Sequence, residues 1–256
     1  MINYEYVLLV YCPALVLLLV LKLKDKVEPS NELQSKCNWS LIPAIIVIGF
    51  EGTNLIAIAI LQQIVAVTKF QVSAFIWEFL SFCSYCLVLI LSLTLLRFVY
   101  RQSIVSLFEL RGTLLLFTLK IAGILSVVNI LSIYFLGLNM VAGPLKERIE
   151  VIKSMEPKTF ILFGFVCLIL APAVEEIVYR GLLYVPLHRK LGKYGAILLS
   201  SLLWSYGHHS SSPSATIGTF IIGLILGWLY ERSGSLIPPM VFHAFKNSWI
   251  LVYYFG

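Results

Sequence analysis

Charged residues are scarce in this sequence. Asp, Glu, Lys and Arg make up 12% of the 256 residues, about half their share in a typical soluble domain. Hydrophobic residues reach 59%, above the usual share of about 45–50%. So little charge cannot give a folded domain a polar surface in water. We therefore expect an all-α, polytopic transmembrane helical bundle, because helices satisfy their own backbone hydrogen bonds in lipid.

Three common protease signatures are also missing. Asp25 is the single aspartate of the chain, so a pair of catalytic aspartates cannot be assembled. The sequence has no HExxH and no GxSxG, which are the usual spacings of a helical zinc protease and of a serine nucleophile turn. The CxxC of Cys83 and Cys86 stands in an apolar run without a second pair. Hydrolytic chemistry in this chain has to use other residues.

The charge that is present is mostly basic, with a formal net charge of +6. No basic run occurs, and no stretch alternates basic and aromatic residues, so the signature of a nucleic-acid partner is missing. Lys and Arg that flank membrane spans give a net charge of the same sign. We expect the lipid bilayer as a partner and no nucleic acid.

Eight apolar runs are candidates for membrane spans, which need about 20 residues each. They cover roughly 6–22, 41–63, 73–98, 113–136, 159–183, 194–209, 214–231 and 236–255. The sixth and seventh runs are short and weakly separated, so seven spans with a re-entrant segment are an alternative. Spans this close together in the sequence predict one membrane-embedded domain over 1–256.

Ionisable side chains inside these runs are costly, at about 2.5–3.5 kcal/mol each even on lenient insertion scales. In the first half of the chain, Glu51 and Glu78 line a substrate path or are paired structurally; the sequence leaves both open. The C-terminal part holds most of the others: Glu175, Glu176, Arg180, His208, His209, His243, Lys246 and Asn247. Each of them needs a partner or a function.

The stretch EEIVYR places three charges in the fifth run. Glu176 and Arg180 are four residues apart, so they share a helix face and can form an ion pair. Glu175 points about 100° away and has no local cation. One interpretation is a structural ion pair with a stray neighbour. The other is a free carboxylate in a dry bundle, which suits a general base that takes a proton from water.

Two later stretches carry imidazole and amide groups. His208 ends the sixth run and shares a helix face with Trp204, four residues earlier; a histidine at a helix end is often only a polar cap. His243 and Asn247 are also four apart. This pair either joins helices by hydrogen bonds or donates to the oxygen of a carbonyl under attack.

These groups allow two chemical assemblies. A base, histidines and a donor pair are the parts needed for attack of water on an amide. Alternatively, Glu175, His208 and His243 could ligate a metal.

Three motifs in this order, EEIVYR (175–180), WSYGH (204–208) and HAFKN (243–247), resemble the CAAX protease and bacteriocin-processing family of intramembrane endopeptidases. That family includes the Ras-converting type II CAAX prenyl endopeptidases and bacterial abortive-infection-type proteins. The resemblance covers about 165–250, and it implies a catalytic core at 159–256 that follows N-terminal spans and loops at 1–158. The family commonly has Phe where this chain has Trp204.

The resemblance also implies residue roles. Glu175 would activate water with His208, and His243 with Asn247 would form the oxyanion hole. Glu176, Arg180 and Trp204 would be supporting residues. We expect a glutamate protease without a cofactor, because an asparagine amide is a poor zinc ligand and a good hydrogen-bond donor; zinc bound by the same residues is the alternative.

The expected substrate is a peptide or protein terminus presented at the membrane, such as a lipidated CAAX tail or a bacterial leader peptide. We expect a multi-pass integral protein of the bacterial cell membrane. Two other functions compete with proteolysis: a non-enzymatic immunity or scaffold protein of the membrane, and a proton-coupled transporter. The lack of inverted repeats counts against the transporter.

Overall fold

The computed structural model describes residues 40–68, 72–99, 107–108, 116, 118–120, 123–124, 152–208 and 213–255. Each regular element assigned within these ranges is helical, as the composition predicts. An N-terminal hairpin and a C-terminal helical core make up most of the described chain.

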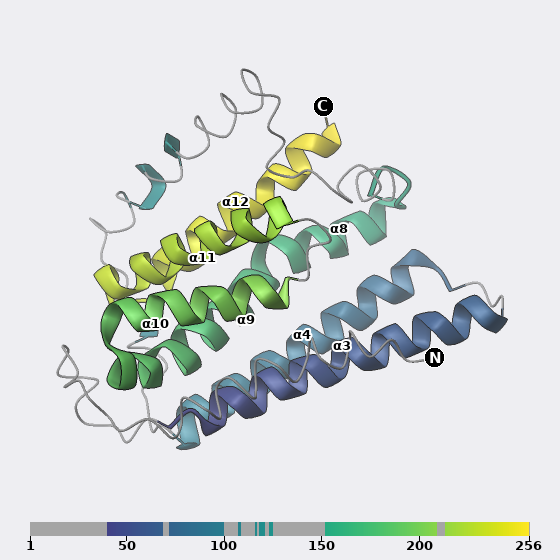
Figure 1. Cartoon of the computed structure of the whole chain (residues 1–256). Helices are drawn as coiled ribbons and strands as arrows, with labels where there is room; N and C mark the ends of the chain where they lie inside the picture. The colour runs from purple at the N-terminus through teal and green to yellow at the C-terminus, as the bar shows by residue number, and fades with distance from the viewer. Residues whose placement is uncertain are drawn as a thin grey trace.

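The hairpin consists of α3 (Ile42–Thr68) and α4 (Ala74–Thr94), which run side by side in Figure 1. A short π-helical stretch, η1 (Leu95–Val99), continues α4. Many of the large apolar side chains of the hairpin are exposed in the bundle: Ile46, Leu61, Ile64, Ile76, Phe79, Leu87 and Ile90. Lipid tails are as apolar as these side chains, so this surface suits the interior of a bilayer.

The chain from residue 157 to residue 207 is helical on both sides of one break, where it reverses direction. It comprises α8 (Pro157–Phe165), η2 (Val166–Leu170), α9 (Ala171–Glu176), η3 (Ile177–Tyr184) and α10 (Val185–Gly207). Within α10, Gly192 has φ 72° and ψ 175°, a conformation that glycine adopts without a Cβ clash. The helix breaks there and the chain folds back. As a result, Trp204 reaches Glu175 from 29 residues away.

Two further helices, α11 (Pro213–Ser233) and α12 (Ile237–Phe255), pack on this core. Gly234, with φ 64°, supplies the left-handed residue of the tight turn between them. Ser205 Oγ of α10 donates to the Thr216 carbonyl oxygen of α11 at 2.8 Å. Figure 1 shows α11 and α12 lying next to each other.

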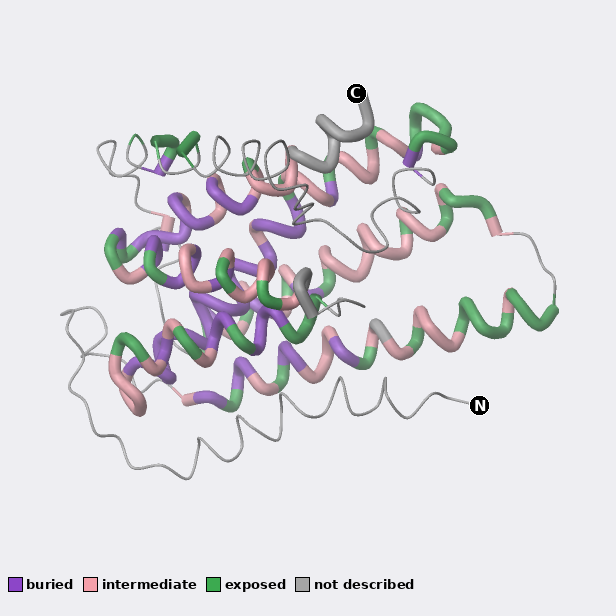
Figure 2. Tube along the Cα trace, turned by 45° about the horizontal axis from the view of Figure 1, so that its top comes forward, coloured by how far each residue is buried: buried purple, intermediate pink, exposed green. Residues whose placement is uncertain are grey.

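The most deeply buried segment is η3, whose residues are buried along its whole length (Figure 2). The largest fully buried side chains include Trp204, Arg180 and Tyr184. Polar and charged groups therefore occupy the centre of the bundle, where each needs a partner from another element.

Within the described residues, three stretches are long and apolar enough to cross a membrane: Ile42–Thr68, Ala74–Val99 and Pro157–Gly207. The first two coincide with the predicted spans 41–63 and 73–98, and the third contains 159–183 and 194–209 on either side of Gly192. The helices α11 and α12 occupy the last two predicted spans but are not among these three. The predicted span 6–22 and most of 113–136 lie outside the described residues. The predicted total of about eight spans is therefore not confirmed.

Candidate active site

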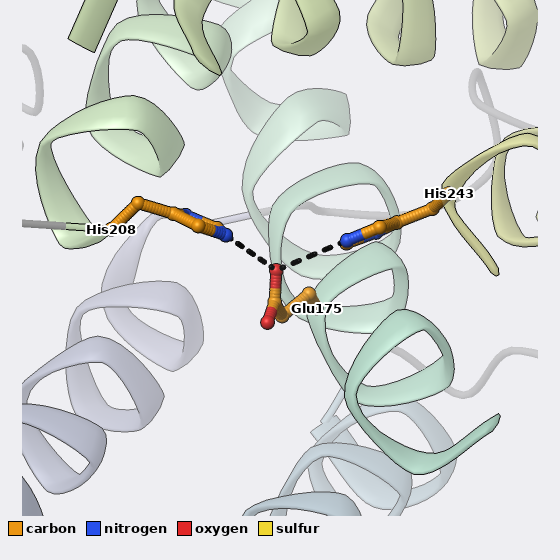
Figure 3. A group of neighbouring side chains, drawn as sticks. All are labelled: Glu175, His208 and His243. Atoms are coloured by element: carbon orange, nitrogen blue, oxygen red, sulfur yellow. Dashed lines mark ion pairs between the residues drawn. The ribbon is translucent and has the colours of Figure 1, made fainter. Parts of the chain in front are cut away.

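Three of the side chains selected from the sequence meet at one point of the bundle. Glu175 comes from the end of α9, His208 follows the last residue of α10, and His243 lies in the first half of α12. Glu175 Oε2 is 3.6 Å from His208 Nε2 and 3.8 Å from His243 Nε2. In Figure 3 the carboxylate stands between the two imidazole rings. Helices far apart in the sequence thus bring these three groups together.

The other ring nitrogen of each histidine is held by an oxygen. His208 Nδ1 is 2.9 Å from the Trp204 carbonyl oxygen, and His243 Nδ1 is 2.9 Å from Glu176 Oε1. A carbonyl or an ionised carboxylate only accepts, so both Nδ1 atoms donate. In the neutral ring, each Nε2 then presents a lone pair toward Glu175. Three acceptor atoms converge, and a water, a proton or a cation between them would satisfy them.

Two donors from different helices hold the Glu175 carboxylate. The Trp204 indole Nε1–H donates to Oε2 at 2.7 Å, and the Tyr85 hydroxyl of α4 donates to Oε1 at 3.4 Å. The Trp204 ring also lies 4.2 Å from the His208 ring and 5.4 Å from the His243 ring, between centroids. Trp204, which the resemblance implies to be a supporting residue, therefore lies against all three side chains of the cluster.

The ion pair predicted between Glu176 and Arg180 is present. Arg180 donates from NH1 to Glu176 Oε1 at 3.1 Å, and both side chains are fully buried. Arg180 NH2 also donates to the Gly223 carbonyl oxygen of α11 at 3.1 Å. Because Glu176 Oε1 accepts from both Arg180 and His243, the pair fixes the orientation of the His243 ring. That second contact is not visible in the sequence, because it joins residues 67 apart.

Gly223 lets α10 and α11 approach closely beside this cluster. A Cβ at position 223 would lie 3.0 Å from Ser201 Cβ, 3.1 Å from Ser201 Cα and 3.1 Å from Trp204 Cε3. Since one of these is a backbone atom, the neighbouring helix would have to move. The small residue thus permits the contact between Arg180 and the α11 backbone.

Asn247 makes a contact outside the cluster. Its Nδ2 donates to the Cys167 carbonyl oxygen of η2 at 2.9 Å. The bond ties α12 to the segment that leads into α9 and Glu175. The amide carries two N–H donors, so one remains chemically available. His209 lies outside the described residues.

The three side chains of the cluster are buried to different degrees. Those of His243 and Glu175 are 2% and 10% exposed, whereas that of His208 is 33% exposed. Gly207, next to His208, faces the Tyr179 hydroxyl, which would lie 3.1 Å from a Cβ at that position. His208 is therefore the most exposed member of the cluster.

The donor set also fits a metal ion. One ligand atom each from Glu175, His208 and His243 lies within 4.8 Å of the others, and a zinc site commonly has ligands of this kind. Zinc-binding histidines usually donate their second N–H to a carboxylate or a backbone carbonyl, as both histidines do here. The geometry alone is therefore compatible with zinc at this point.

Sequence reasoning missed Tyr85 as a neighbour of Glu175. It lies 90 residues away in a helix without a motif. The hydrogen bond from Trp204 could have been predicted from the sequence. A buried indole N–H generally needs an acceptor, and Glu175 was the carboxylate without a local cation.

Comparison with protein families gives one match. Residues 157–249 match the family described as type II CAAX prenyl endopeptidase Rce1-like, which confirms the resemblance to CAAX proteases over this region. No curated protein and no solved structure matches the chain. The matched region contains Glu175, His208, His243 and Asn247; Tyr85 lies outside it.

Proposed function

Starting from the Rce1-like domain at 157–249, we propose that this multi-pass integral membrane protein is a glutamate-type intramembrane endopeptidase. The observation that carries the proposal is the convergence of Glu175 Oε2 with the Nε2 atoms of His208 and His243. The family match independently supports a peptidase of the CAAX type in general. Membrane location is supported by the same match and by the long apolar helices.

In the first chemical step, Glu175 acts as a general base. Oε2 takes a proton from a water molecule, and the lone pair of His208 Nε2 accepts a hydrogen bond from the second hydrogen of that water. The water oxygen bonds to the carbonyl carbon of the scissile peptide, and the electron pair of the C=O bond moves to the carbonyl oxygen. The hydrogen bonds from Trp204 and Tyr85 hold the carboxylate in this orientation.

The negative oxygen needs donors, and His243 with Asn247 supply them in this proposal. Asn247 has a second N–H beyond the one that binds Cys167. His243 donates from Nε2 when both of its ring nitrogens are protonated. In the resting site this Nε2 is an acceptor, so the role requires His243 to take up a proton as the negative oxygen forms.

In the second step, the tetrahedral intermediate collapses. The C–N bond breaks, and the proton held by Glu175 passes to the leaving nitrogen, which becomes an amine. The new carboxyl group leaves with the other product fragment, and Glu175 is again a carboxylate. The atoms balance with one water consumed per bond cleaved.

The proposed substrate is a peptide or protein terminus at the membrane, either a lipidated CAAX tail or a bacterial leader peptide. We place the protein in a bacterial cell membrane. Two internally quenched probes separate the substrate classes: a farnesylated CAAX peptide and an unlipidated leader peptide.

The test uses the purified full chain in lipid nanodiscs with both probes. We expect the wild type to cleave at least one of them and Glu175→Gln to lose about 10²–10⁴-fold in kcat, the usual contribution of general-base catalysis. Glu156→Gln is the control, because this carboxylate is exposed and paired with Lys158 at 3.0 Å, and we expect it to retain activity. Cleavage that survives in Glu175→Gln, or a folded wild type that cleaves neither probe, contradicts the proposal; the second result favours an immunity or scaffold protein.

A metal-dependent protease is the second candidate, favoured because both histidines donate from Nδ1 to an oxygen, the Trp204 carbonyl or Glu176 Oε1. Glu175, His208 and His243 would hold a zinc ion, which would lower the pKa of a bound water and polarise the carbonyl. Against this candidate, the indole of Trp204 already donates to Oε2 at 2.7 Å, the oxygen that faces both rings. Elemental analysis and a chelator series decide between the two: inhibition reversed by added zinc establishes the metal.

A further inference from the structure

The N-terminal hairpin contributes a side chain to the site. The Tyr85 hydroxyl of α4 donates to Glu175 Oε1 at 3.4 Å, and α4 packs against α9 and η3, the elements that carry Glu175 and Arg180. From the same hairpin, α3 packs against η3. The hairpin thus turns a polar side chain, Tyr85, toward a site whose other members lie in the C-terminal core.

The two oxygens of Glu175 have different environments. Oε2 accepts from Trp204 at 2.7 Å and faces both imidazoles, whereas Oε1 points toward α4. A carboxylate oxygen that is buried without a donor is unfavourable. The Tyr85 hydroxyl is the donor that the structure places at Oε1. By holding one oxygen on the α4 side, this donor fixes the plane of the carboxylate so that the other oxygen faces the histidines.

We propose that Tyr85 is a positioning residue for Glu175, supplied by the N-terminal hairpin, and that efficient hydrolysis depends on it. The proposal rests on the function proposed above, in which Glu175 is the base. It assigns a role in the reaction to α4, which lies outside the region matched by the family. Tyr85 acts through Glu175 and does not take a proton itself.

Apolar packing sets the position of the tyrosine. Phe82, one helical turn before Tyr85, packs against Phe165 of α8, with 6.2 Å between ring centroids. The register of α4 against α8 therefore determines where the hydroxyl lies. The distance of 3.4 Å is long for an O–H···O bond, and catalytic hydrogen bonds often tighten only once substrate is bound. We accordingly expect an effect at the lower end of the range for a bond to a charged group.

The test compares Tyr85→Phe with Tyr184→Phe in the full chain. Tyr184 is a matched control because its hydroxyl also donates to a carboxylate, Glu231 Oε2 at 2.7 Å, away from Glu175. We expect Tyr85→Phe to lower kcat about tenfold per folded molecule, with KM within about twofold and thermal stability close to that of the wild type. Tyr184→Phe should lower thermal stability and leave kcat per folded molecule unchanged.

If Tyr85 had only a structural role, its substitution would lower thermal stability and leave kcat per folded molecule unchanged. A Tyr85→Phe protein that melts at lower temperature while kcat per folded molecule stays at the wild-type value overturns the proposal. A rise in KM with unchanged kcat also overturns it, because positioning the base affects the chemical step.

Glu175→Gln, measured in the same assay, separates the two proposals. If Glu175→Gln is inactive and Tyr85→Phe matches the wild type, only the role of Tyr85 fails. If Glu175→Gln stays active, the proposed function and the role of Tyr85 fail together.

Discussion

The hairpin and the C-terminal core are both built from apolar helices, yet they bury very different side chains. In the most apolar windows of α3 and α4, 24% and 17% of the residues are buried, against 50% in the stretch Pro157–Gly207. The core buries an ion pair, a carboxylate and a histidine at its centre. Apolar composition thus identifies helices that fit a membrane, while the position of the polar groups shows which of them form a site.

The largest expected effect comes from breaking the buried ion pair of the core. Arg180→Met leaves Glu176 charged and the Gly223 carbonyl without its donor, and removal of one partner of a buried pair typically costs about 3–5 kcal/mol. We expect little folded protein and no cleavage. Thermal unfolding in nanodiscs measures the loss. The double variant Glu176→Gln/Arg180→Met should recover part of the stability, and a single variant as stable as the wild type would show that the pair is dispensable.

The next effect concerns close packing in the core. Gly223→Ala places a methyl group 3.1 Å from Ser201 Cα and from the Trp204 ring, and overpacking typically costs about 1–3 kcal/mol. Displacement of Trp204 should also lower cleavage. Gly164→Ala is the matched control, because a Cβ there has no neighbour within 4 Å. Equal stability and activity of the two variants would contradict the packing described here.

The two side chains that donate to Glu175, one from the core and one from the hairpin, should differ in their effect on kcat. Trp204→Phe restores the residue that the resembled family commonly has, and we expect it to remain active with kcat about 10-fold to 100-fold lower, because a bond to a charged group contributes about 1.5–3 kcal/mol. This loss should exceed that of Tyr85→Phe, since the indole bond is 2.7 Å long and the hydroxyl bond 3.4 Å.

The double variant Trp204→Phe/Tyr85→Phe tests whether the two donors act on the same carboxylate. We expect a loss in kcat larger than the product of the two single losses, because no donor from Trp204 or Tyr85 would then hold Glu175. Simple multiplicative losses would indicate that the two side chains act independently.

The smallest effect is expected on the outer surface of the hairpin. Leu87 and Ile90 of α4 are 52% and 62% exposed, and substitutions of such surface residues usually change stability by less than about 0.5 kcal/mol. Leu87→Ala and Ile90→Ala should therefore cleave like the wild type, although Leu87 is two residues from Tyr85. A large loss of activity in either variant would mean that the outer face of α4 also serves the reaction.

The sequence predicts those parts of the site that follow from local spacing. The pair of Glu176 and Arg180 is an i, i+4 contact within one helical stretch, and the ordered motifs locate Glu175, His208 and His243. Contacts between elements could not be predicted, because they depend on how helices pack. Tyr85 with Glu175, and Asn247 with Cys167, are of this kind. The fold-back at Gly192 was visible only as a polar interruption between two apolar runs.

In the proposed reaction, Glu175 Oε2 and the two Nε2 atoms surround the water that attacks a peptide bond. The most direct measurement is an experimental structure of Glu175→Gln with an uncleaved probe bound, either the farnesylated CAAX peptide or the leader peptide. We expect the scissile carbonyl carbon within about 3–3.5 Å of a water that contacts residue 175 and His208, with the carbonyl oxygen facing His243 and Asn247. A peptide bound elsewhere in the bundle, with its carbonyl remote from these side chains, would contradict the proposal.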